Sequence, residues 1–123
     1  MKELNTKKTQ NKLRSKFLKM GVKMMGPETI FFSKDTKIGK NVEIEPYVVF
    51  ANNVQIGNNV KILSFSHLDG VKIENNVSIG PYARLRPGSK IKSGSKIGNF
   101  VEVKKTIIAV SYTHLTLPTN ACV

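Results

Sequence analysis

Cysteine, histidine and acidic residues are scarce in this chain of 123 residues. The single cysteine, Cys122, excludes an internal disulfide framework. The two histidines, His67 and His114, are too few for a zinc site with three histidine ligands. The N-terminal segment, 1–30, holds no apolar run long enough for a signal peptide or a membrane span. We therefore expect a cytoplasmic protein with no metal site and no membrane partner.

The shortage of acidic residues leaves a formal net charge of +12, which is spread unevenly. Residues 1–25 carry eight Lys or Arg against one acid, and the other residues carry twelve against seven. A basic segment can bind nucleic acid, but here no aromatic residues alternate with the charges to stack on bases. The apolar side chains fall at helical spacing instead, and Gly21 is a plausible helix end; they are Leu13, Phe17, Met20 and Met24. We predict a basic helical arm over 1–25, helical over roughly 10–20, and no nucleic-acid partner.

The most regular feature of the chain is an apolar residue at every sixth position from residue 38 onward. The first run is Ile38, Ile44, Phe50, Ile56, Ile62 and Leu68, and after a slip of one residue the second is Ile73, Ile79, Leu85, Ile91, Ile97 and Val103. A smaller residue follows four places later in most units: Val42, Val48, Val54, Val60, Ser66, Val77, Ala83, Ser89, Ser95 and Val101. A unit of this size cannot bury its own apolar face, so the units must stack on one another.

A six-residue unit is a short strand with a turn, and three such units close one triangular coil. A period of six excludes an amphipathic helix and a single alternating strand, and leucine-rich repeats need about 20 residues or more. Glycines and paired asparagines stand where corners need residues that tolerate positive φ: Gly39, Gly57, Gly80, Gly98 and the pairs at 52–53, 58–59 and 75–76. The prediction is an all-β fold, a parallel β-helix over 26–108. Because the repeat makes fewer than four coils, we expect it to need caps, an oligomer or more chain.

The last segment, 109–123, has no Gly or Asn corner between Ala109 and Leu115, which fall on the period, and its sequence reads as unrelated to the repeat. We expect it to be a non-native or disordered tail, joined to a truncated domain.

Four segments resemble a known enzyme family: 79–88 (IGPYARLRPG), 97–105 (IGNFVEVKK), 26–32 (GPETIFF) and 44–50 (IEPYVVF). Over roughly residues 10–108 the chain is similar to the linker arm and acetyltransferase domain of the bifunctional enzymes that make UDP-N-acetylglucosamine. Those enzymes are glucosamine-1-phosphate N-acetyltransferases and N-acetylglucosamine-1-phosphate uridylyltransferases that serve cell-wall precursor synthesis. The resemblance implies a left-handed β-helix, a homotrimer, acetyl-CoA as co-substrate and glucosamine 1-phosphate as substrate. It implies Mg²⁺ only for the uridylyltransferase domain, whose motifs this sequence does not contain.

The resemblance implies that Arg86 and Lys104 hold the phosphorylated sugar. Their spacing gives separate support, because they lie three repeat units apart, which is one full coil, and each follows a core position. Such residues sit one above the other, about 4.8 Å apart in the stacking direction. An arginine fork beside a lysine point charge suits a phosphate monoester. On spacing alone, two solvated surface cations are an equal alternative. We expect Arg84 to make a salt bridge or a subunit contact.

Neither histidine is predicted to be catalytic. We interpret His67 as a corner residue before the slip in the repeat. The resemblance places the general base in a His-Leu-Thr-Tyr segment two full repeat units after Lys104, whereas His114 falls short of that position and precedes Leu-Thr-Leu. We therefore expect the chain itself to be inactive. Two alternatives stay open: another hexapeptide acyl- or nucleotidyltransferase, and a non-catalytic β-helix used as a trimerisation module.

Overall fold

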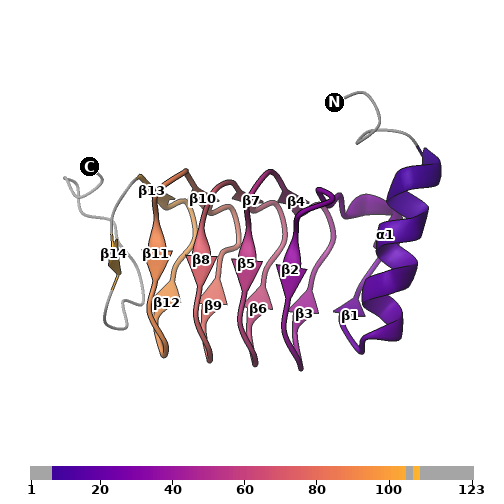
Figure 1. Ribbon diagram of the computed structural model, residues 1–123. Coiled ribbons are helices and arrows are strands. Elements are labelled where there is room, and N and C mark those ends of the chain that lie inside the picture. Colours follow the sequence, from indigo (N-terminus) through magenta and orange to yellow (C-terminus); the bar gives the residue numbers. More distant parts are fainter. Residues whose placement is uncertain (1–6, 105–106, 109–123) are drawn as a thin grey trace.

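The computed structural model describes residues 7–104 and 107–108, which form one helix and a parallel solenoid (Figure 1). Helix α1 spans Lys7–Lys19 and a 3₁₀ turn spans Pro27–Thr29. The strands are two residues long: β1 (Lys23–Met24), β2 (Lys37–Ile38), β3 (Glu43–Ile44), β4 (Val49–Phe50), β5 (Gln55–Ile56), β6 (Lys61–Ile62), β7 (His67–Leu68), β8 (Lys72–Ile73), β9 (Ser78–Ile79), β10 (Arg84–Leu85), β11 (Lys90–Ile91), β12 (Lys96–Ile97), β13 (Glu102–Val103) and β14 (Ile107–Ile108). None of the helices in the described residues is long and apolar enough to span a membrane.

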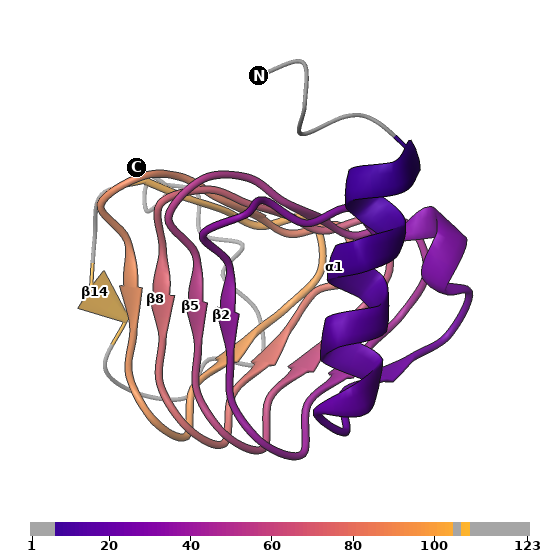
Figure 2. The same ribbon diagram turned by 45° about the vertical axis from the view of Figure 1, so that its right-hand side comes forward.

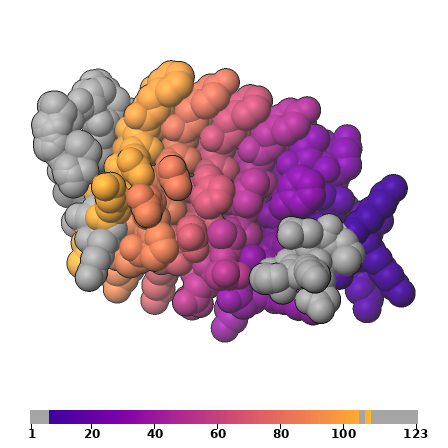
Figure 3. Space-filling view, turned by 90° about the horizontal axis from the view of Figure 1, so that it is seen from above, coloured from indigo at the N-terminus to yellow at the C-terminus, as the bar shows by residue number. Residues whose placement is uncertain are grey.

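The strands form three parallel sheets, one on each side of the solenoid, so every third strand is a neighbour. Their orders are β1-β3-β6-β9-β12, β13-β10-β7-β4 and β14-β11-β8-β5-β2. Successive coils pair in register, as where Ile79 faces Ile62 on one side and Ile97 on the other. Figure 3 shows the coils as successive bands of colour along the molecule. The predicted left-handed parallel β-helix is confirmed.

The core is the row of side chains that the six-residue period selects. All twelve predicted large positions and all ten smaller ones named above are buried. The hydroxyls of two buried serines donate hydrogen bonds to backbone carbonyls. Ser66 donates to the Leu63 carbonyl at 2.9 Å and Ser89 to the Arg86 carbonyl at 2.7 Å. The solenoid also begins earlier than the repeat, since β1 pairs with β3 and Phe31 bridges to Val49. It therefore has about five turns, more than the repeat alone predicts.

The corners use residues that the sequence pattern identified only in part. The second asparagine of each predicted pair, and Gly80, has positive φ as expected, but Gly39, Gly57 and Gly98 do not. Gly39 is needed for space, because a Cβ there would meet the Gly57 carbonyl oxygen at 2.7 Å. An unpredicted set of aromatic residues occupies the corner between the first and second sheets at positive φ, and their rings stack 4.9–5.2 Å apart: Tyr47, Phe65, Tyr82 and Phe100.

Helix α1 lies across the N-terminal end of the solenoid (Figure 2). Phe17 is 1% exposed and its ring lies 4.7 Å from that of Phe32. Gln10 pairs with the Phe32 backbone in both directions, since its Nε2 donates to the carbonyl at 2.8 Å and its Oε1 accepts from the N–H at 2.9 Å. Arg14 donates from Nε to the Ile30 carbonyl at 2.9 Å. The helix is an end cap that supplies the hydrogen bonds and apolar contact of a missing coil.

The prediction of which residues form the buried face of α1 is therefore partly wrong. Leu13 and Phe17 do pack on the solenoid, but Met20 is 48% exposed and Met24 lies in β1. Polar Gln10 and Arg14 take the buried places, because the solenoid end offers unpaired backbone groups as well as apolar surface.

Candidate functional site

The candidate site is on the second sheet, where β7, β10 and β13 lie side by side toward the C-terminal end. The outward residues of these strands form a row, His67, Arg84 and Glu102, each the Cα partner of the next. The core residues Leu68, Leu85 and Val103 alternate with them and fix the direction of the row. Ionisable side chains of three coils thus share one exposed surface.

Arg86 and Lys104 lie on adjacent coils of this surface, directly after β10 and β13. Leu85 and Val103 are Cα partners, and the Arg86 N–H donates to the Val103 carbonyl at 2.8 Å. The Ser89 hydroxyl donates to the Arg86 carbonyl at 2.7 Å, so both backbone groups of Arg86 are held. The structure brings the two predicted residues together, and their binding of a ligand stays a prediction.

Glu102 is a member of this cluster that the sequence analysis missed. Its Oε2 lies 3.5 Å from Nη1 of Arg86, and both side chains are about two-fifths exposed. The signal was present, because Glu102 precedes the core residue Val103 and must point outward next to Arg84. The six-residue period predicts that Glu102 lies on the exposed surface of the second sheet, but it does not predict which arginine Glu102 contacts.

The structure bears on the expectations for two neighbouring residues: it corrects that for His67 and leaves a subunit contact as the prediction for Arg84. Among the described residues Arg84 makes no ion pair, although it is the Cα partner of Glu102. His67 is not at a corner but on β7, where its side chain is exposed. The corner follows at Gly70, whose φ is +59°. His114 lies outside the described residues.

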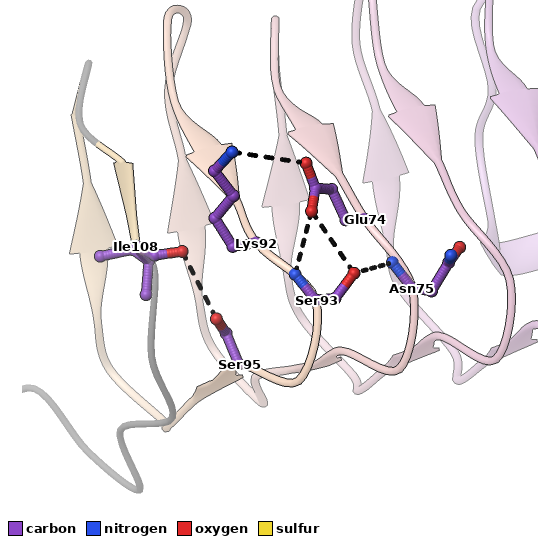
Figure 4. A network of polar contacts seen from close by, with 6 residues as sticks. All are labelled: Glu74, Asn75, Lys92, Ser93, Ser95 and Ile108. Carbon is purple, nitrogen blue, oxygen red and sulfur yellow. Dashed lines mark hydrogen bonds and ion pairs between the residues drawn. The ribbon is translucent and has the colours of Figure 1, made fainter.

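A second polar cluster, on the third sheet, joins coils through side chains and backbone (Figure 4). The Glu74 carboxylate accepts from the Ser93 N–H at 3.2 Å and lies 3.8 Å from Nζ of Lys92. The Ser93 hydroxyl accepts from the Asn75 N–H at 3.2 Å. In the same coil as Ser93, the Ser95 hydroxyl donates to the Ile108 carbonyl of the next coil at 3.4 Å. Lys92 thus has an ion-pair partner in the preceding coil. This cluster ties neighbouring coils together.

The Glu74 cluster predicts a pH dependence of stability. The hydrogen bond from the Ser93 backbone, helped by Lys92, lowers the pKa of Glu74 below its ordinary value of 4.5. A carboxyl whose pKa is lower in the folded state stabilises above its unfolded pKa, and that contribution is lost as the pH falls through the folded value. We expect Glu74→Gln to lower the urea midpoint at pH 7 and to have a smaller effect at pH 3. An equal shift at both pH values would contradict the assignment.

The family model of the bacterial transferase hexapeptide, six repeats long, matches residues 35–70 and 70–105. The chain belongs to this hexapeptide family. Its two matched segments span β2 to β13 and so include the stacked arginine and lysine.

Within the hexapeptide family, the curated relatives include proteins named bifunctional protein GlmU. The chain is 49% identical to that of Zymomonas mobilis over 109 residues, covering 87% of this chain and 24% of the relative. It is 42% identical to that of Wolbachia pipientis wMel over 114 residues, covering 91% of this chain and 26% of the relative. The resemblance drawn from the sequence is confirmed, and the chain spans about a quarter of these relatives' length.

A solved structure shares the fold of this hexapeptide chain. It is the H141N mutant of perosamine N-acetyltransferase from Caulobacter crescentus in complex with CoA and GDP-perosamine, with a TM-score of 0.50 and 16% identity. The match covers 85% of this chain and 61% of that one. At this identity the likeness supports the solenoid fold and not a shared substrate.

Proposed function

We propose that this chain carries part of the sugar-phosphate binding site of a glucosamine-1-phosphate N-acetyltransferase domain. The observation that carries the proposal is the placement of Arg86 and Lys104 on adjacent coils of one exposed sheet. Two cations at adjacent positions of neighbouring coils favour binding of an anion, and the one carboxylate found beside them, that of Glu102, contacts only Arg86 at 3.5 Å. The identity to GlmU proteins supports a sugar phosphate as that anion.

In the proposed reaction the amine of glucosamine 1-phosphate attacks the thioester carbonyl of acetyl-CoA, the amide bond forms, the C–S bond breaks, and the CoA thiol leaves with the proton given up by the amine. Acetyl-CoA is the co-substrate that the chain would share with its family. The described residues act at the other end of the sugar. The guanidinium of Arg86 offers two parallel N–H donors to phosphate oxygens, and Lys104 adds a point charge. Held by the backbone bonds of Arg86, this pair would orient the phosphate and fix the direction of the amine.

Substitution of either cation is expected to weaken binding of glucosamine 1-phosphate to the chain by about tenfold or more, since hydrogen bonds to charged groups contribute about 1.5–3 kcal/mol. Arg86→Gln and Lys104→Gln keep polar stems and remove the charge. Binding would be followed by NMR titration with the sugar phosphate, and with glucosamine as the ligand without phosphate.

Lys96→Gln is the matched control, because Lys96 is an exposed lysine on β12 in another sheet. It should leave binding unchanged, and all three variants should keep the wild-type unfolding midpoint. Unchanged affinity in Arg86→Gln and Lys104→Gln would favour the alternative of a non-catalytic β-helix.

Other expectations for the domain remain proposals. We also propose a homotrimer, a cytoplasmic location and domain boundaries at residues 25 and 108. The inactivity of the chain on its own depends on His114, which lies outside the described residues. An acetylation assay beside a His114→Ala variant would test it.

A further inference from the structure

Glu102 contacts Arg86 and not Arg84, the residue directly opposite it on the neighbouring strand. Glu102 stands in register with Arg84, which is its Cα partner on β10. Its carboxylate nevertheless lies 3.5 Å from Nη1 of Arg86, and Arg84 makes no ion pair within the described part of the chain. One carboxylate therefore has two arginines beside it and contacts one.

The observed contact is weak and easily displaced. Strong arginine–carboxylate pairs have N–O distances of about 2.7–2.9 Å and are often bidentate. Here a single pair of atoms is 3.5 Å apart, and the side chains of Arg86 and Glu102 are 44% and 41% exposed. Exposed pairs of this kind contribute little to stability and are screened by salt. A phosphate monoester carries more negative charge than a carboxylate, so it can replace Glu102 as the partner of the Arg86 guanidinium.

Arg84 can receive the displaced carboxylate without any movement of the backbone. Residues directly opposite on neighbouring strands lie about 4.8 Å apart, and both Arg84 and Glu102 point outward on the same row. A change of side-chain rotamers is enough to form the second pair.

We infer that Glu102 competes with the phosphate for Arg86. In the free protein the Glu102 carboxylate contacts the Arg86 guanidinium, and when a phosphate binds Arg86 and Lys104 this carboxylate moves to the guanidinium of Arg84. Arg84 is then a positioning residue, which acts on the ligand through Glu102. The inference rests on the proposed function, since it needs an anion at Arg86.

The free state is tested without any ligand. The side-chain Nε–Hε NMR signals of Arg84 and Arg86 report on their partners. Glu102→Gln should shift the Arg86 signal and leave that of Arg84 nearly unchanged. Adding glucosamine 1-phosphate to the wild-type chain should then shift both signals, whereas in Glu102→Gln it should shift that of Arg86 alone. A ligand-free shift at Arg84 instead of Arg86 would overturn the inference.

Affinities separate the competitor from a direct role of Arg84. Glu102→Gln should tighten binding of glucosamine 1-phosphate by about twofold to fivefold, the range expected for an exposed ion pair. Arg84→Gln should weaken binding by a similar factor in the wild-type chain and have little effect in the Glu102→Gln background. Arg84→Lys should retain most of the wild-type affinity.

Each failure has its own signature. Equal weakening by Arg84→Gln in both backgrounds would show that Arg84 binds the ligand directly, and weaker or unchanged binding in Glu102→Gln would show that the glutamate does not compete. Binding that persists in Arg86→Gln and Lys104→Gln, or binding in none of the variants, would contradict the proposed function itself. All substituted side chains are at least partly exposed, so folding is checked by the unfolding midpoint.

Discussion

Replacement of Phe17 by alanine is expected to lower the free energy of unfolding by about 3–5 kcal/mol. Phe17 is 1% exposed and closes the N-terminal end of the core, where Phe32 lies between it and Phe50 with ring centroids 4.7 and 5.0 Å apart. Alanine is a better helix former than phenylalanine, so the loss measures the missing contact and not a weaker helix. Urea unfolding followed by circular dichroism gives the difference.

Leu18→Ala is the matched control for this prediction. Leu18 is the next residue of α1 and is 46% exposed, so its truncation should change stability by less than about 0.5 kcal/mol. Similar losses in the two variants would mean that α1 does not cover the solenoid end.

Ile79→Ala is expected to destabilise the middle of the solenoid by about 2–5 kcal/mol. Ile79 is fully buried and touches the equivalent positions of two coils, because Ile62 and Ile97 are its Cα partners. The short coils leave little room for neighbours to close the cavity. Ile79→Val should cost about 0.5–1.5 kcal/mol in the same urea experiment.

Ile107→Ala provides the comparison at an exposed isoleucine. Ile107 faces outward from β14 and is 60% exposed, so its truncation should have little effect. If Ile79→Ala were as mild as Ile107→Ala, the register of β6, β9 and β12 would be wrong.

The solenoid was predictable because its period translates directly into burial. In a strand–turn unit of fixed length, a residue's place in the repeat decides whether its side chain points inward, and no distant contact changes that. The same logic placed Arg86 and Lys104 on adjacent coils. The slip before Ile73 was visible too, as a shortened unit that contains Gly70.

The end cap was not predictable by the same means. Helical periodicity looks for apolar residues, and it selected Met20 over Gln10 and Arg14. The buried face of α1 is decided by what it covers, which is a coil with free carbonyl and N–H groups at Ile30 and Phe32. The ion-pair partner of Glu102 could not be predicted either, because the side-chain rotamers and not the backbone positions decide whether Glu102 contacts Arg84 or Arg86.

The position of α1 ahead of the solenoid in the chain has a consequence for synthesis on the ribosome. Chains fold from the N-terminus as they emerge, and an unpaired strand edge is prone to join another molecule. Here the helix that covers the N-terminal end of the solenoid precedes the coils in the chain. Each later strand pairs with the strand one coil before it, as β10 does with β7 and β13 with β10. If the coils form in the order of synthesis, the incomplete solenoid has one unpaired strand edge, at its C-terminal end, and the next coil to form covers that edge.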